Sequence, residues 1–231
     1  MRWRRADGVL VPPQDFIPVA EETGLVANID EWVLEAACAQ AMAWQRQGLP
    51  PLPVSVNVSL VRLDAERLLA HVAAVLQRTG LAPRWLEIEF RGAQLFPHGA
   101  RARAMVAELK ALGVRIAADD FGSGQASLGD LAHFAFDTLK IDRTYIGSMA
   151  NDHGAATIIE AVLAIGRVMG YHVVAKGVET DAQRDALVAM GCARAQGLLF
   201  GGADAPAVLA ARLAPPGATD AGDGDATQAD A

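Results

Sequence analysis

A repeated order of helix, glycine and short apolar strand constrains the fold of this chain more than any other feature. An amphipathic helical stretch ends at each of four glycines, and a short apolar run follows each one: Gly80, Gly113, Gly170 and Gly191. Glycine is favoured just past a helix end because it adopts the left-handed conformation without a Cβ penalty. Helices that alternate with nearly all-apolar strands indicate a mostly parallel sheet covered by helices.

This pattern predicts both the strands and the helices. We expect strands at 54–58, 85–90, 114–118, 138–141, 171–175 and 195–199, with a further stub at 1–4. We expect helices at about 14–23, 29–47, 64–79, 98–112, 155–169 and 181–190. Asn28, with Glu31 three residues on, predicts the N-cap of the second helix, and Trp32 lies on its apolar face. An open doubly wound sheet stays an alternative, since six strands are two short of an eight-stranded barrel.

Composition indicates a folded body followed by an acidic tail. Hydrophobic residues make up 52% of the 231 residues, and the net charge of −7 disfavours broad DNA or RNA binding. We expect one domain over 1–213 and a disordered tail over 214–231, which holds four aspartates and no lysine or arginine. Two cysteines and the lack of a long apolar run predict a cytoplasmic protein without a membrane span.

Polar side chains appear where the predicted strands end. The carboxyl ends of parallel strands converge on one rim, where barrels and open sheets build their sites. Oxygen ligands of this kind suit Mg²⁺, Mn²⁺ or Ca²⁺, and two adjacent aspartates need a cation nearby. The segment 121–124 that follows them is either a lid loop or an ordinary turn. The rim residues are Asn57, Glu89, Asp119, Asp120, Lys140, Lys176 and Gln196.

Seven segments, in the same order, resemble the EAL domain family of bacterial cyclic-di-GMP phosphodiesterases. The resemblance runs from about residue 1 to 204 and implies a modified (β/α)₈ TIM barrel whose first strand is antiparallel to the rest. The segments are Asp15–Gly24, Val56–Ser59, Leu86–Glu89, Asp119–Gly124, Leu139–Asp142, Val174–Thr180 and Gln196–Phe200.

The resemblance also implies an activity and a set of site residues. Active members use two divalent ions, Mg²⁺ or Mn²⁺, and a bound water to convert cyclic-di-GMP to pGpG. Metal-ligand positions fall on Asn57, Glu89, Asp119 and Asp120, and Lys140 would orient the attacking water, so that Lys140 and Asp120 are the catalytic candidates. Contacts to the nucleotide are implied for Arg2, Ser123 and Gln196.

Three departures from the family pattern make this chain a degenerate member. Met1, Arg2 and Trp3 match the end of the Glu-Ala-Leu-x-Arg-Trp motif, so the metal-binding Glu and the family's first strand and most of its second would precede residue 1. Gly92 stands where the family has a Glu that steadies the lid. Lys176 stands where it has a further carboxylate.

Charge at the rim decides what these departures imply. A full set of five carboxylates and one lysine carries four negative charges, which balance two divalent ions. Here three carboxylates face Lys140 and Lys176, which leaves a single negative charge. We therefore doubt two-metal occupancy and expect the ammonium of Lys176 to take the place of the second ion and pair with Asp119 or Asp120.

Three functions follow from these observations. The first is a catalytically silent module that binds cyclic-di-GMP or acts through a protein partner, an upstream signalling domain or a homodimer. The second is an active or residual phosphodiesterase that tolerates Lys176. The third is a different barrel enzyme with Lys140 or Lys176 as a Schiff-base amine.

Overall fold

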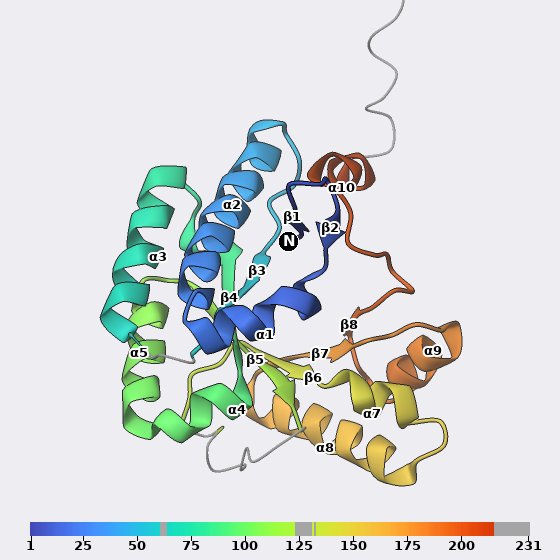
Figure 1. The fold of residues 1–231 in the computed structure, drawn as a ribbon. Coiled ribbons are helices and arrows are strands. Elements are labelled where there is room, and N and C mark those ends of the chain that lie inside the picture. Colours follow the sequence, from blue (N-terminus) through green and yellow to red (C-terminus); the bar gives the residue numbers. More distant parts are fainter. Residues whose placement is uncertain (61–63, 123–130, 132, 215–231) are drawn as a thin grey trace, which may run out of the picture.

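A single parallel sheet organises the computed structural model, which describes residues 1–60, 64–122, 131 and 133–214 (Figure 1). The sheet has six strands in the order of the chain, and it curls as a half-barrel with helices on its outer face. Doubly wound sheets reverse their strand order near the middle, so the unbroken order excludes that alternative and confirms the barrel type. The strands are β3 (Val54–Asn57), β4 (Leu86–Arg91), β5 (Arg115–Phe121), β6 (Thr138–Ile141), β7 (His172–Lys176) and β8 (Arg194–Gln196).

The predicted helices are all present, and their ends differ from the expected ones by a few residues. Three shorter α-helices, α4, α7 and α10, were not predicted, because each is too brief to show a helical period. The helices are α1 (Pro13–Thr23), α2 (Val26–Arg46), α3 (Ala65–Thr79), α4 (Gly92–Leu95), α5 (Gly99–Ala111), α7 (Arg143–Ser148), α8 (His153–Met169), α9 (Asp181–Ala189) and α10 (Pro206–Leu213), with 3₁₀ turns at Pro83–Trp85 and Phe96–His98.

The predicted N-cap at Asn28 is wrong. Gly24 ends α1 in the left-handed conformation, and α2 begins two residues later at Val26. Asn28 thus lies inside the first turn of α2, where its Oδ1 accepts a hydrogen bond from Arg67. A reciprocal capping box instead starts α9, where Thr180 and Gln183 each satisfy a backbone N–H of the other.

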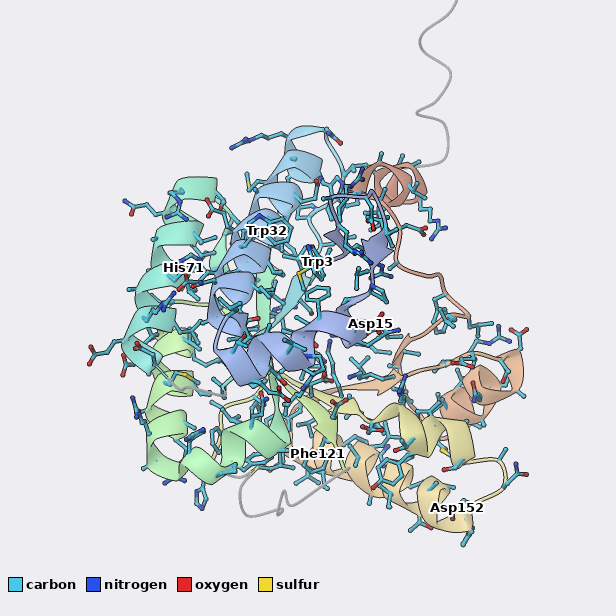
Figure 2. All side chains as sticks on the ribbon, viewed as in Figure 1. Trp3, Asp15, Trp32, His71, Phe121 and Asp152 are labelled. Carbon is cyan, nitrogen blue, oxygen red and sulfur yellow. The ribbon has the colours of Figure 1, made fainter. Side chains whose placement is uncertain are left out.

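The N-terminal stub does not join the six-stranded sheet, contrary to expectation. Strand β1 (Trp3–Arg4) pairs antiparallel with β2 (Leu10–Val11) as a separate hairpin. The hairpin packs on α1, where the ring of Trp3 lies edge-on to Phe16 at a centroid distance of 6.0 Å (Figure 2). Among the described residues, β3 and β8 are therefore the two edges of the sheet.

The core lies between the sheet and its outer helices. Strand residues such as Ile88, Ile116 and Leu139 are fully buried and pack in one cluster with Leu34 and Leu109 from the helices. No helix in the described part of the chain is long and apolar enough to cross a membrane. The predicted tail lies outside the described residues, apart from Ala214.

Candidate functional site

The carboxyl ends of the strands bring the predicted polar residues to one rim of the half-barrel. Asn57, Asp119, Asp120 and Lys176 line an open cavity of about 490 Å³ between the sheet and helices α1 and α2. Glu89 and Lys140 lie beside them, in the carboxyl-terminal halves of β4 and β6, and both are buried. The strand-end pattern thus correctly located a polar rim.

A β-bulge in β5 turns both aspartates toward the same partner. Consecutive strand residues normally point to opposite faces of a sheet. Between Ala118 and Phe121, however, the pairing of β5 with β6 shifts by one residue, and Asp120 takes a left-handed backbone conformation with φ of 53°. An extra residue of this kind re-aims side chains, which explains how neighbouring carboxylates reach one ammonium group.

That ammonium group belongs to Lys176, the last residue of β7. Its Nζ donates to Oδ1 of Asp119 at 2.6 Å and to Oδ1 of Asp120 at 2.7 Å. Burial alone would lower the pKa of Lys176, but the hydrogen bonds and the attraction of the two carboxylates outweigh it and raise this pKa above its ordinary value. Lys176 is therefore charged at neutral pH, and the predicted pairing is confirmed.

A second lysine is paired in the same way one strand further back. The ammonium of Lys140 on β6 forms an ion pair with Oε1 of Glu89 on β4, and each side chain is less than a tenth exposed. Below this pair, Glu87 accepts hydrogen bonds from the hydroxyls of Ser55 at 2.8 Å and Thr138 at 2.7 Å. The interior carboxylates of the half-barrel thus already have cationic or hydroxyl donors.

The donor set does not fit a binuclear metal centre. Three carboxylates at the rim are held by two ammonium groups, and Asn57 is an exposed neutral amide. Within the ranges that the structure describes, no group of three or more His, Cys, Asp or Glu side chains is arranged to hold a metal ion. A divalent ion would have to displace a buried or half-buried ammonium from its carboxylates.

The opposite wall of the cavity carries polar residues that sequence reasoning missed. Oε1 of Glu21 lies 3.6 Å from Arg91 and 3.5 Å from Nε2 of Gln94, and both partners follow or end β4. Asp30 of α2 accepts a hydrogen bond from the backbone N–H of Ser59 at 2.8 Å. The sequence did contain a sign of Asp30, because an acidic residue on the apolar face of a predicted helix indicates a buried carboxyl group.

Asp30 has the most perturbed carboxyl pKa of the described residues. Burial raises its pKa to about 6, and the nearby charge of Glu21 adds to the rise. The hydrogen bond from Ser59 and the charge of Arg91 oppose it only partly. The cavity therefore has a carboxyl group that takes up a proton in mildly acidic solution.

Of the predicted nucleotide contacts, Arg2 and Gln196 are not among the residues that line this cavity. Arg2 lines a different, mostly apolar cavity of about 570 Å³ with Trp3 and Trp32, although Met1 borders both. Gln196 is exposed on the edge strand β8, directly opposite Lys176 in the ladder. Ser123 lies outside the described residues. These three assignments therefore stay predictions.

Gly92 is tightly enclosed. It is buried at the start of α4, and a Cβ built there would lie 2.7 Å from a ring carbon of Phe96. Phe96 in turn packs edge-on against Phe134 and Phe136. A larger residue at position 92 would push this ring, so the glycine matches the local packing.

The comparisons with known proteins agree on one family. A family model described as EAL domain matches residues 1–203. An uncharacterized signaling protein of Caulobacter vibrioides is 44% identical over 201 residues, which are 87% of this chain and 24% of that protein. The bifunctional diguanylate cyclase/cyclic di-GMP phosphodiesterase MucR of Pseudomonas aeruginosa is 37% identical over 87% of this chain and 29% of that protein. The chain thus spans about a quarter of the length of these curated relatives.

A solved structure supports the fold directly. The PaMucR phosphodiesterase in complex with c-di-GMP superposes with a TM-score of 0.83 at 37% sequence identity. The match covers 87% of this chain and 81% of that one. The half-barrel therefore has the fold of a domain that was solved in complex with c-di-GMP in that relative.

Proposed function

The chain belongs to the EAL domain family, which includes cyclic-di-GMP phosphodiesterases, and from this membership we propose that it is a cyclic-di-GMP-binding signalling domain that does not hydrolyse the nucleotide. The observation that carries the proposal is the pairing of every rim carboxylate with a lysine. Metal-dependent hydrolysis needs carboxylates that are free to hold cations.

Electrostatics favours the ammonium of Lys176 over a divalent ion. Lys176 lies within hydrogen-bond distance of both aspartates. Because it is part of the chain, it neutralises part of their charge without the entropy cost that a metal ion pays to bind from solution. A divalent ion at this point would meet an adjacent positive charge and a rim with one net negative charge. Lys176 thus takes the place that a second cation would need, and the lost cation removes the means to activate a water.

Binding of the nucleotide is supported by the shape and polar lining of the cavity. At about 490 Å³ it has the size of ordinary small-molecule sites, and the polar side chains of Arg91, Gln94 and Asn57 are part of its lining. Arg91 has a half-exposed side chain whose guanidinium can meet a phosphate oxygen. Arg2, Gln196 and Ser123 are proposed as further contacts because they match family positions that touch the nucleotide, although Arg2 and Gln196 do not line the cavity.

A protein-interaction role has its own support. Trp3 is 52% and Trp32 is 62% exposed, and both line the apolar cavity on the outer side of α1 and α2 (Figure 2). Exposed apolar surfaces of this kind mark interaction sites. We therefore include protein contact in the proposal, as the route by which a bound nucleotide is reported.

The second candidate function is an active phosphodiesterase that produces pGpG. It is favoured by the gathering of Asn57, Glu89, Asp119, Asp120 and Lys140 at one rim, and by the 37% identity to MucR. This function needs Mg²⁺ or Mn²⁺ to compete with Lys176 for the two aspartates.

Calorimetry and chromatography together separate the two functions. Cyclic-di-GMP is titrated into the protein with EDTA and then with Mg²⁺, and the mixture is analysed for pGpG after incubation with Mg²⁺ or Mn²⁺. The proposal expects saturable binding of unchanged affinity in both buffers and no pGpG. Formation of pGpG that Asp119→Ala abolishes would establish the phosphodiesterase instead, and an absence of saturable binding in either buffer would refute the binding function.

A further inference from the structure

A second polar cavity lies at the opposite end of the sheet, where β7 and β8 begin. Its volume is about 160 Å³. His172 starts β7 and Lys176 ends it, so at about 3.3 Å per residue the two ends lie about 13 Å apart. The residues that line this cavity are Leu163, Arg167, Tyr171, His172, Val173, Gly191, Ala193 and Arg194.

The lining is cationic in a chain whose overall charge is negative. Arg167 and Arg194 carry positive charges, and His172 is a third basic side chain in the lining. No Asp or Glu lines the cavity. In the described part of the chain, no salt bridge joins any of these three side chains to a carboxylate. The nearby Asp137, whose backbone oxygen accepts from the N–H of His172, has its carboxylate bound by Lys110.

Arg167 is exposed, and its guanidinium lies beside the turn that precedes β8. It belongs to the last turn of α8, yet its Nη1 lies 3.7 Å from the point that a Cβ at Gly191 would occupy, in the turn before β8. Gly191 has φ of 82°, a left-handed conformation that glycine adopts without strain. The guanidinium of Arg167 on α8 thus lies beside the backbone turn that leads to Arg194 on β8.

The walls around these side chains are fixed by buried packing and hydrogen bonds. The hydroxyl of Tyr171 donates to the backbone oxygens of Leu131 and Phe134 at 3.2 and 3.0 Å. The N–H of Cys192 donates to the oxygen of Leu187, which ties the turn before β8 to α9. Gly166 lets α8 pack directly on Val173, because a Cβ there would lie 2.3 Å from the Val173 side chain. A preformed shape lowers the entropy cost of binding a ligand.

We propose that this cavity binds a phosphate group, either as inorganic phosphate or as the terminal group of a phosphate monoester. Guanidinium groups present planar forks of N–H donors that match the oxygens of phosphate. A water molecule occupies about 30 Å³ in the liquid, so a cavity of about 160 Å³ has room for a phosphate. The proposal goes beyond the cyclic-di-GMP function and does not depend on it, since the two cavities share no residue.

Calorimetry on the whole chain at constant ionic strength tests the proposal. Inorganic phosphate and glycerol phosphate are titrated in turn, with sodium chloride adjusted so that only the phosphate group differs. We expect saturable one-to-one binding of at least one probe, weakened about tenfold or more by Arg167→Ala and by Arg194→Ala. The probe that binds more tightly identifies the source of the phosphate.

Matched variants separate this site from general charge effects. Arg103→Ala removes the same charge from an exposed position on α5 and is expected to leave binding unchanged. Lys176→Met alters the cavity at the other end of the sheet, and it is also expected to leave phosphate binding unchanged. If a variant fails to fold by circular dichroism, Arg167→Lys keeps the charge but loses the fork and is expected to weaken binding. No saturable heat with either probe up to about 10 mM would overturn the proposal, as would equal losses in Arg103→Ala and Arg167→Ala.

Discussion

The Nζ of Lys176 lies 2.6 Å from Oδ1 of Asp119, although β6 separates the strands that carry the two residues. Lys140 on β6 crosses β5 in the same direction to reach Glu89 on β4. The two lysines thus link alternate strands across the rim, and both links depend on carboxylates that face the inside of the half-barrel.

Lys176→Met is expected to destabilise the protein and to create an affinity for cations. Removing the ammonium leaves Asp119 and Asp120 side by side without their counter-charge, at a cost of about 1–3 kcal/mol because the pair is only partly buried. Urea denaturation would measure this cost, and Mn²⁺ should restore part of the stability of the variant but not raise that of the wild type. Arg78→Met, which breaks an exposed pair with Glu35, is the control and should change little. Equal responses to Mn²⁺ in wild type and Lys176→Met would contradict the role given to Lys176.

Lys140 and Glu89 should behave as one unit in a double-mutant cycle. Lys140→Met leaves a buried carboxylate without its partner and is expected to cost about 3–5 kcal/mol. The double variant Lys140→Met with Glu89→Leu removes the unpaired charge and should cost less than Lys140→Met alone. Urea midpoints of the four proteins give the coupling free energy, and strictly additive changes would show that the pair does not interact.

Asp30 should make the stability of the protein fall as the pH rises from about 4 to 7. Burial raises its pKa to about 6 from 3.8, so the folded protein holds this proton more tightly than the unfolded chain. The resulting stability is present below the unfolded pKa and is lost by pH 7, by about 3 kcal/mol. Asp30→Asn removes this titration, so the variant should gain on the wild type between pH 4 and pH 7. The gain is read from urea denaturation at both pH values, with Glu35→Gln as an exposed control; parallel pH profiles for Asp30→Asn and wild type would exclude the effect.

Gly92→Ala is expected to destabilise the protein by about 1–3 kcal/mol because the new Cβ would lie 2.7 Å from the Phe96 ring. Gly147→Ala on α7 is the matched control, since nothing lies within 4 Å of its Cβ position. That control should gain about 0.5–1 kcal/mol, as expected for alanine in place of a helical glycine. Thermal melting of both variants checks the contrast, and a neutral Gly92→Ala would show that Phe96 moves freely.

Most strands were predictable because they are short apolar runs that end near a polar residue; β8 is the exception, since it lies at Arg194–Gln196 and not at the expected 195–199. The pairing of Lys176 with the aspartates was predictable for a related reason: residues at the carboxyl ends of neighbouring strands meet at one rim. The charge balance of the rim needed only the sequence. These features depend on local pattern and on the known geometry of parallel sheets.

Other features could not be predicted, because the sequence does not show which segments pair or pack together. The bulge at Asp119 and Asp120 exists only in the register between β5 and β6. The wall formed by Glu21, Asp30 and Arg91 arises where α1 and α2 pack over the end of β4. The stub at Trp3 was expected to be a strand of the main sheet. It pairs instead with Leu10–Val11 in a local hairpin.

The lysine that bridges Asp119 and Asp120 also bears on how such a domain changes over generations. A lysine codon and a glutamate codon differ by a single base, so one point mutation separates an ammonium at the end of β7 from a carboxylate. That change would remove the ammonium that pairs with Asp119 and Asp120 and add a third carboxylate beside them. A single base change in this gene would therefore yield a protein with a more negatively charged rim, which attracts cations more strongly.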